Sequence, residues 1–270
     1  MYEVDNSTLT ISGDPVQFPL VGSPWSPMMI LGAYLFFVLK LGRKIMENRK
    51  PFDLRGVIKV YNIVQIVYNS VVLLSAVYFL FVLKAYDMSC VHTLPLDHEY
   101  KNWERLISYS YYFNKYMDLV ETVFFVMRKK DRQISFLHVF HHTIMCVGGY
   151  LYLIFSGYGG LLFPVCLLNV AVHVIMYTYY YLSSVSPEVQ ASLWWKKYIT
   201  IVQLVQFCLG VSFLINHLRQ PNCNASRTVI YMGTLVGAAF ITLFTNFYVK
   251  AYILPGRKKS QMKVSCPRLN

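Results

Sequence analysis

The stretch Ile134–Phe155, ISFLHVFHHTIMCVGGYLYLIF, joins two properties that seldom occur together. It is long and apolar enough to cross a bilayer as a helix, for which about 20 residues suffice. It also carries His138, His141 and His142 near its start, and ionisable groups inside a membrane span cost roughly 2.5–3.5 kcal/mol each on insertion scales. A membrane helix that keeps three imidazoles on one face indicates a functional site.

The remainder of the chain is equally apolar. Hydrophobic residues make up 56% and charged residues 14% of its 270 positions, too few polar side chains to cover a water-soluble globule. The alternation of a membrane barrel is not seen in the sequence, so we expect an all-α membrane protein with seven transmembrane helices. The predicted spans are Pro27–Leu41, Tyr61–Leu83, Ile107–Met127, Ile134–Phe155, Gly160–Leu182, Tyr198–Asn216 and Val229–Tyr252. We expect one domain over residues 1–270, with a flexible tail at 255–270.

The positive charges predict how the chain is oriented. Most of the 25 Lys and Arg lie in the first, third and fifth connecting loops and in the tail, which places these segments in the cytosol and residues 1–26 in the lumen. The net charge of +12 is therefore a topology signal, and we expect no nucleic-acid partner. Sequons at Asn6 and Asn224 fall in predicted lumenal segments. Cys90 and Cys223 also lie in predicted lumenal segments, and we favour a disulfide between them over two free thiols.

Other predicted spans carry polar side chains grouped on single helix faces. These are Lys115, Asp118, Glu121 and Thr122 in the third span, Asn169, His173 and Tyr177 in the fifth, and Gln203 and Gln206 in the sixth. Counting about 1.5 Å per residue from the predicted cytosolic ends puts five of the polar groups roughly 9–14 Å deep. They are Asp118, His141, His173, Gln203 and Gln206. A shared polar chamber open to the cytosol would suit an anionic substrate. Candidate phosphate contacts are Arg128, Lys129, Lys130, Lys196 and Lys197, for which orientation and lipid head-group contact is the alternative interpretation.

Four motifs, in order, resemble those of the ELO/ELOVL fatty acid elongases, and the resemblance covers nearly the whole chain. They are NKYMDLVETVFFVMRKK at Asn114–Lys130, HVFHH at His138–His142, NVAVHVIMYTYY at Asn169–Tyr180 and YITIVQLVQF at Tyr198–Phe207. One departure concerns the acidic pair of the first motif. The family usually has Glu first and Asp second, whereas here Asp118 precedes Glu121.

The resemblance implies a very-long-chain 3-oxoacyl-CoA synthase (3-ketoacyl-CoA synthase) of the endoplasmic reticulum membrane. Such an enzyme condenses acyl-CoA with malonyl-CoA to 3-ketoacyl-CoA, CoA and carbon dioxide. It also implies a bundle in which helices two to seven surround an acyl tunnel, with no bound cofactor and no metal. The implied partners are membrane lipid, a ketoacyl reductase, a dehydratase, an enoyl reductase and a second copy of the chain.

Histidine chemistry fits this condensation, because a neutral imidazole is both a nucleophile and a base near neutral pH. We expect His141 or His173 to accept the acyl group, with the other activating it or stabilising the enolate; His138 and His142 complete the candidate catalytic set. The expected hydrogen-bond donors to substrate oxygens are Asn169, Gln203 and Gln206. Asp118 and Glu121 would fix histidine tautomers, and Lys115 would balance their charge.

Two alternatives stay open at the level of sequence. Membrane di-iron desaturases and hydroxylases also carry HxxHH boxes, but they generally use more histidines than the seven of this chain. A seven-span receptor would share the predicted topology, although its ligand pocket would usually open outward rather than toward the cytosol. Metal analysis separates the first alternative from the condensing enzyme, and incorporation of labelled malonyl-CoA separates the second.

Overall fold

A computed structural model describes residues 13–221, 223 and 226–254, and these residues form helices and no strands. The helices are α1 Trp25–Phe36, α2 Gly42–Met46, α3 Arg55–Val77, α4 Lys101–Met127, α5 Phe136–Ser156, α6 Phe163–Val185, α7 Pro187–Ala191, α8 Leu193–Leu218 and α9 Arg227–Tyr248. Tight 3₁₀ turns lie at Asp131–Gln133 and Gly160–Leu162, and wider π turns at Phe37–Leu41, Tyr78–Val82 and Val249–Ile253. The prediction of an all-helical fold is confirmed for the described residues.

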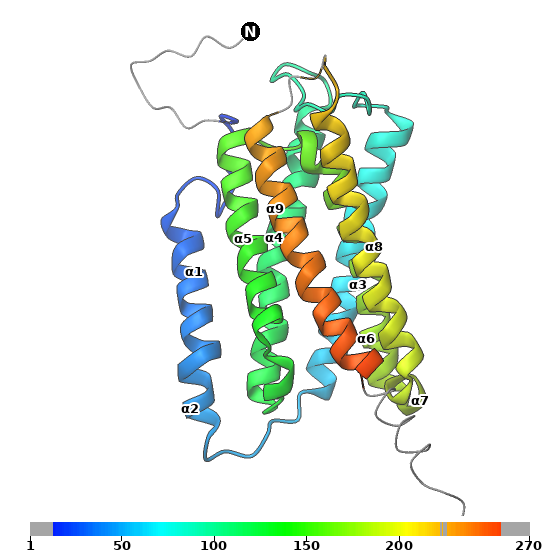
Figure 1. Cartoon of the computed structure of the whole chain (residues 1–270). Coiled ribbons are helices and arrows are strands. Elements are labelled where there is room, and N and C mark those ends of the chain that lie inside the picture. Colours follow the sequence, from blue (N-terminus) through cyan, green and yellow to red (C-terminus); the bar gives the residue numbers. More distant parts are fainter. Residues whose placement is uncertain (1–12, 222, 224–225, 255–270) are drawn as a thin grey trace, which may run out of the picture. The chain divides into compact units, whose positions relative to one another are not determined.

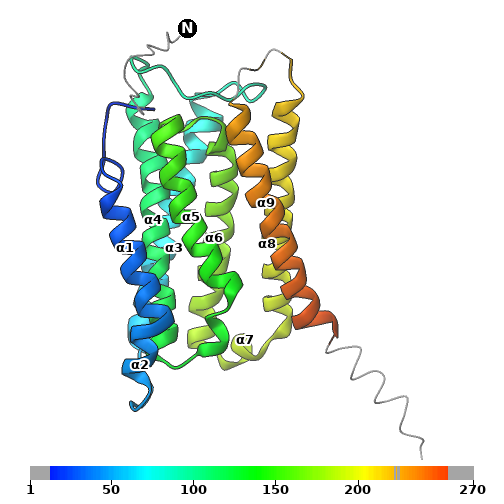
Figure 2. The ribbon, with the colours of Figure 1, turned by 60° about the vertical axis from the view of Figure 1, so that its left-hand side comes forward.

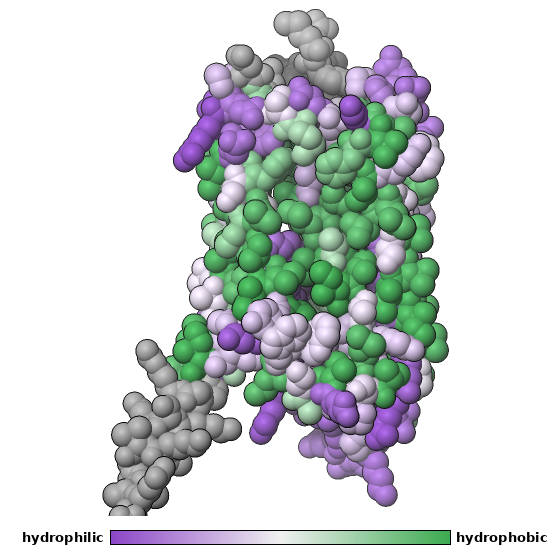
Figure 3. Space-filling view, turned by 90° about the vertical axis from the view of Figure 1, so that its right-hand side faces the viewer, coloured by the Kyte–Doolittle hydropathy of each residue, from purple (hydrophilic) through white to green (hydrophobic). Residues whose placement is uncertain are grey.

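Six helical segments are long and apolar enough to cross a membrane, so the chain is a multi-pass membrane protein. They are Trp25–Met46, Arg55–Val82, Phe136–Ser156, Gly160–Val185, Leu193–Leu218 and Arg227–Ile253. Large apolar side chains on these segments point outward; Met29, Leu74 and Leu235 are 66%, 67% and 65% exposed. Figure 3 shows apolar side chains along the middle of the helices on the face in view and hydrophilic ones toward their ends. Lipid is the solvent that suits such a surface.

The third predicted span, Ile107–Met127, corresponds to α4, which differs from the six segments above. It is a helix of 27 residues that begins at Lys101, six positions before the predicted start at Ile107. Its buried side chains include the charged Glu104, Lys115 and Asp118, and it is not among the six apolar segments. Its passage through the membrane, like the acyl tunnel, stays a prediction.

The chain divides into two compact units, each with its own helix contacts. The first joins Met1–Leu54 with Leu74–Cys166, and the second joins Arg55–Leu73 with Leu167–Asn270. In the first unit α5 packs against α4 and α1, and α2 packs against α4 (Figure 1). In the second unit α8 and α9 lie side by side (Figures 1 and 2). The single domain expected from the sequence stays a prediction.

A glycine permits one close helix contact in the first unit, and aromatic rings pack between helices in the second. A Cβ atom on Gly42 would lie 2.8 Å from Cγ1 of Val126, so α2 approaches α4 closely at this point. Between α8 and α9, the ring of Phe207 lies 5.3 Å from that of Phe240 and 5.1 Å from that of Phe244, centroid to centroid. Apolar packing of this kind, together with interhelical hydrogen bonds, holds membrane helices together.

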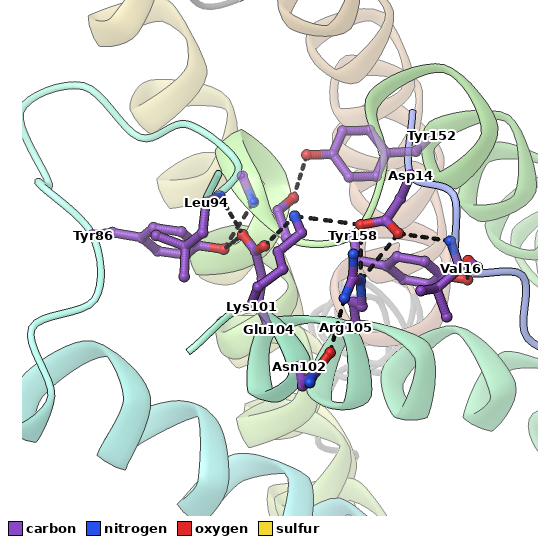
Figure 4. A network of polar contacts seen from close by, with 12 residues as sticks. Asp14, Val16, Tyr86, Leu94, Lys101, Asn102, Glu104, Arg105, Tyr152 and Tyr158 are labelled. Atoms are coloured by element: carbon purple, nitrogen blue, oxygen red, sulfur yellow. Dashed lines mark hydrogen bonds and ion pairs between the residues drawn. The ribbon is translucent and has the colours of Figure 1, made fainter. Parts of the chain in front are cut away.

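A buried charge network fixes the first turns of α4 in the first unit (Figure 4). The Arg105 guanidinium donates through Nε to both carboxylate oxygens of Asp14 at 3.0 Å. The Lys101 ammonium donates to Glu104 Oε2 at 2.7 Å and lies 3.5 Å from Asp14 Oδ2. Two carboxylates and two cations therefore balance one another in a site that water scarcely reaches, since all four side chains are buried.

Tyr86 and a glycine turn complete this network. The Tyr86 hydroxyl donates to Glu104 Oε1 and accepts from the backbone N–H of Gly160 at 2.9 Å, while the N–H of Leu94 donates to the same carboxylate oxygen at 3.1 Å. Burial, with the Glu104 charge adding to it, raises the pKa of Tyr86 well above its ordinary value, so this phenol keeps its proton. Gly159 has φ +87° and faces Glu104 so closely that a Cβ atom would overlap the carboxyl group.

Candidate active site

The histidine cluster lies on the first turns of α5. Ser135 caps this helix, because its side chain accepts a hydrogen bond from the His138 backbone N–H at 3.2 Å. From there the i, i+3, i+4 spacing gathers the three imidazoles: the ring centroids of His138 and His142 are 4.4 Å apart and those of His141 and His142 are 5.2 Å apart. Three imidazoles of the first unit thus form one cluster.

The neighbouring helix α4 contributes a buried charged face. Lys115, Asp118 and Thr122 are each at most 2% exposed, and Glu121 is 9% exposed. The Lys115 ammonium donates to Asp118 Oδ2 at 3.2 Å and lies 4.8 Å from the centre of the Tyr111 ring. The sequence predicts a charge-balancing role for Lys115, and an ion pair with Asp118 is the contact that such a role requires.

The charged face of α4 meets the histidine cluster at two points. The hydroxyl of Thr122 lies 2.9 Å from Nε2 of His138. Glu121, His138 and His142 each bring a ligand-type atom within 4.8 Å of the others. Thr122 received no role from the sequence, although its place on the face of Lys115 and Asp118 was visible there. Two imidazoles and one carboxylate are also a donor set that transition metals accept, so the expected absence of a metal stays a prediction.

His173 is a buried polar residue of the second unit. It is 6% exposed, and its Nδ1 lies 2.8 Å from the backbone carbonyl oxygen of Asn169, one turn earlier on α6. A carbonyl oxygen only accepts, so Nδ1 carries a hydrogen, and in the neutral imidazole Nε2 then carries the lone pair. This is the tautomer in which Nε2 acts as a nucleophile or a base.

A chain of hydrogen bonds links α3 to α6 in the second unit. Asn69 Nδ2 donates to Gln65 Oε1 at 3.1 Å, Gln65 Nε2 donates to the Tyr61 hydroxyl at 3.1 Å, and the Tyr61 and Tyr177 hydroxyls are 3.4 Å apart. Tyr177 is fully buried, and its ring centroid lies 6.0 Å from that of His173. Gln65 and Asn69 are not among the residues predicted from the sequence, although their i, i+4 spacing within an apolar span was the signal that could have identified them.

The glutamines of α8 contribute polar atoms to the same unit. Gln206 is 7% exposed, and Gln203 Nε2 donates to the Met176 sulfur at 3.7 Å. Thr200, one turn before them, is 5% exposed and donates to the backbone carbonyl of Lys196 at 3.0 Å. These contacts place the carboxamide of Gln203 beside α6, four residues after Ile199, the first buried residue of α8.

The predicted phosphate contacts lie at the ends of helices. Arg128 is half-buried at the end of α4, whereas Lys129 and Lys130 are exposed. A surface depression is lined by Lys129, Lys130, Asp131, Arg132 and Gln133, and Lys129 Nζ donates to the backbone carbonyl of Glu47 at 3.0 Å. Near the start of α8 in the second unit, Lys196 is half-buried and Lys197 is exposed. Positive charge thus borders each unit, and its contact with a substrate stays a prediction.

The remaining predicted sites differ in how far the structure describes them. Asn6 and Asn224 lie outside the described residues. Cys90 and Cys223 are both disulfide-bonded cysteines, and their pairing stays a prediction. His141 belongs to the first unit and His173 to the second, so the common chamber expected for them also stays a prediction.

The fold and the site define the class: this is a multi-pass helical membrane protein with a histidine cluster beside a buried acidic face. Comparison with known proteins identifies the family. Residues 19–260 match the ELO family, described as the GNS1/SUR4 family, and the chain belongs to it. The chain is 60% identical over 248 residues to very long chain fatty acid elongase F of Drosophila melanogaster, covering 92% of this chain and 96% of that protein.

More distant relatives carry similar names. Very long chain fatty acid elongase 7 of Rattus norvegicus is 39% identical over 240 residues, which cover 86% of this chain and 83% of that protein. Very long chain fatty acid elongase 1 of Homo sapiens is 38% identical over 244 residues, which cover 87% of this chain and 84% of that protein. The resemblance drawn from the four sequence motifs is thereby confirmed.

Proposed function

We propose that this protein lengthens fatty acids by condensing a long-chain acyl-CoA with malonyl-CoA, as a 3-oxoacyl-CoA synthase. Membership of the elongase family supports this reaction, and its closest support in the structure is the imidazole cluster of α5 beside the buried acidic face of α4. The condensation requires a nucleophile, a base and groups that balance charge, and imidazoles and charged side chains can supply these. The substrates are acyl-CoA and malonyl-CoA, and no bound cofactor takes part.

The proposed first step is acyl transfer to an imidazole, either His141 or His173. The Nε2 lone pair attacks the thioester carbonyl carbon, the carbon–sulfur bond breaks, and the thiolate takes up a proton and leaves as CoA. The hydrogen bond from His173 Nδ1 to the Asn169 carbonyl supports His173 in this role, because it leaves the lone pair on Nε2. His141 is supported by its position in the imidazole cluster.

The proposed second step forms the carbon–carbon bond. Malonyl-CoA loses carbon dioxide, and the electron pair left on its α-carbon attacks the acyl-imidazole carbonyl. The carbon–nitrogen bond then breaks, which releases 3-ketoacyl-CoA and restores the histidine. Side-chain amides of Asn169, Gln203 and Gln206 are the proposed donors to the enolate and carbonyl oxygens.

The proposed setting is the endoplasmic reticulum membrane, with the N-terminus in the lumen and the C-terminus in the cytosol. The basic residues at the ends of α4 and α8 then face the cytosolic CoA pool, where Arg128, Lys130 and Lys197 would contact phosphates. The ketoacyl reductase, dehydratase and enoyl reductase of the cycle are proposed partners, as is a second copy of the chain. Glycosidase-sensitive mass at Asn6 and Asn224 would test this orientation.

Incorporation of labelled malonyl-CoA by purified protein tests the condensation. We expect product only when a long-chain acyl-CoA is also present, and a mass increase of two carbons with one keto group. Protein incubated with acyl-CoA alone should carry the acyl group on a peptide containing His141 or His173. An acyl group on Cys146, Cys166 or Cys208, the free cysteines of the described residues, would overturn the histidine mechanism.

The group of Glu121, His138 and His142 favours one rival function, a metal-dependent oxidation of the acyl chain. Elemental analysis of active protein distinguishes the two. The condensing enzyme should hold far less than one iron or other transition metal per chain, and it should keep its activity after treatment with a chelator. Stoichiometric iron and a loss of activity on chelation would favour the rival.

A further inference from the structure

The first helix reaches the histidine cluster through two hydrogen bonds. On α1, the hydroxyl of Tyr34 donates to Thr122 Oγ1 at 2.9 Å, and the same Thr122 oxygen lies 2.9 Å from His138 Nε2. Tyr34 is 7% exposed and Thr122 is fully buried, so water does not compete for these bonds. Three side chains from α1, α4 and α5, all within the first unit, form one continuous chain.

The donors in this chain can be assigned from the chemistry of a hydroxyl group. Thr122 accepts the hydrogen of Tyr34 and has one hydrogen of its own to donate. Its 2.9 Å contact with His138 Nε2 gives that hydrogen an acceptor, provided that Nε2 carries a lone pair. His138 then carries its hydrogen on Nδ1. In this arrangement both bonds run in one direction, from Tyr34 through Thr122 to His138.

We propose that Tyr34 and Thr122 are positioning residues that hold His138 in the Nδ1–H tautomer and orient its ring within the histidine cluster. The His138 ring lies 4.4 Å from that of His142, which in turn lies 5.2 Å from that of His141. A ring held at one edge of the cluster limits the orientations open to the next. Tyr34 and Thr122 act on the proposed condensation through His138, and this inference rests on the proposed function.

Through Tyr34, α1 has a role beyond anchoring the chain in the membrane. The resemblance to the elongases assigns the acyl tunnel to helices two to seven and leaves the first helix outside. Here α1 packs against α5, and Tyr34 belongs to the buried core that also contains Leu119 and Cys146. Tyr34 is thus the point at which the first helix can influence the chemistry without contacting a substrate.

Substitutions at Thr122 separate positioning from packing. Thr122→Val keeps the volume and removes the hydroxyl, whereas Thr122→Ser keeps the hydroxyl and removes a methyl group. A positioning role predicts that Thr122→Val lowers kcat about 10-fold with KM nearly unchanged, since one hydrogen bond contributes about that factor, and that Thr122→Ser restores kcat. A packing role predicts the reverse, with Thr122→Ser the more damaging change.

Tyr34→Phe tests the start of the chain. It should lower kcat about 3-fold, a smaller effect because Thr122 still contacts His138. The double variant Tyr34→Phe with Thr122→Val should be no slower than Thr122→Val alone, since both act through one chain. Tyr109→Phe is the matched control, because Tyr109 stacks on Phe18 with ring centroids 4.6 Å apart, and we expect no change in kcat. Equal effects of Tyr34→Phe and Tyr109→Phe would overturn the proposal.

The tautomer of His138 can be measured directly, without an assay of condensation. In full-length protein labelled at histidine and reconstituted in bilayers, solid-state nuclear magnetic resonance distinguishes Nδ1–H from Nε2–H imidazoles. The His138 signal is identified by its loss in His138→Asn. We expect Nδ1–H in the unchanged protein and a mixed or Nε2–H signal in Thr122→Val. An Nε2–H signal in the unchanged protein would overturn the inference, whereas inactivity toward malonyl-CoA with the Nδ1–H signal present would overturn only the proposed function.

Discussion

The two ends of α4 bury charge in different ways. At its start, Lys101 and Arg105 face Asp14 and Glu104, so that two positive and two negative groups are matched (Figure 4). Farther along, Lys115 pairs with Asp118, and the second carboxylate, Glu121, lies beside the imidazoles of His138 and His142. One helix therefore carries a balanced network and, about ten residues later, an unbalanced one.

The difference indicates what each network is for. A balanced set of ion pairs has no charge left to offer a substrate, so its value lies in fixing the segments that it joins, here the chain around Asp14, the loop of Tyr86 and the start of α4. A cluster with more carboxylates than cations, placed beside imidazoles that can be neutral or protonated, can exchange protons with a reacting group. Buried charge alone does not mark a catalytic site; the composition of the cluster does.

The largest effect should come from removing one imidazole of the unbalanced cluster. His141→Ala should lower the rate of condensation by up to about 10⁴-fold, the upper range for loss of a nucleophile or base, and leave thermal stability in detergent nearly unchanged. His98→Ala, in the loop before α4, is the control and should leave the rate of condensation unchanged. A His141→Ala enzyme with more than a tenth of the original rate would show that the cluster is not the reaction centre.

The ion pair of the unbalanced cluster should affect both stability and activity. Lys115→Met leaves the buried Asp118 carboxylate without its cation and should lower the free energy of unfolding by about 3–5 kcal/mol. Lys115→Met with Asp118→Asn removes both charges and should recover most of that stability, yet condensation should stay about 10²-fold slower. Thermal unfolding and malonyl-CoA incorporation measure the two quantities on the same samples. Recovery of full activity in the double variant would remove the catalytic distinction between the two ends of α4.

The balanced network should affect stability only. Arg105→Met leaves Asp14 with the more distant Lys101 and should lower the free energy of unfolding by about 3 kcal/mol. Asp14→Asn together with Arg105→Met leaves Lys101 paired with Glu104 and should restore stability. Activity per folded molecule should be unchanged in both variants. A loss of activity at unchanged stability would show that this network also serves the reaction.

The helices were largely predictable, because membrane spans are decided by local hydropathy. The run predicted at Gly160–Leu182 corresponds to the apolar segment Gly160–Val185, and that at Tyr61–Leu83 lies within Arg55–Val82 apart from its last residue. The first span was predicted too short: it continues past Leu41 to Met46, since Arg43 and Lys44 extend a helix as readily as apolar residues do. The start of α4 was missed because Lys101, Glu104 and Arg105 appear too polar until their partners are known.

The partners themselves lie far away in the chain, which is why spacing could not reveal them. Asp14 and Arg105 are 91 residues apart, and Tyr34 and Thr122 are 88 residues apart. Helical spacing did predict that Lys115, Asp118 and Thr122 share a face, because that relation is local. It could not show that a tyrosine of α1 would contact this face, since the packing of α1 within the first unit determines that contact.

The smallest effect should come from the glycine turn that closes the balanced network. Gly159→Ala places a Cβ atom against the Glu104 carboxyl group at a residue with φ +87°, and should lower the free energy of unfolding by about 1–3 kcal/mol. Gly148→Ala is the matched control, because no atom lies within 4 Å of the added methyl group and alanine favours the helix α5. Thermal unfolding of the two variants in the same detergent measures the difference. If Gly159→Ala were as stable as Gly148→Ala, the loop could move away from Glu104 at little cost, and the balanced network would be less rigid than its matched charges imply.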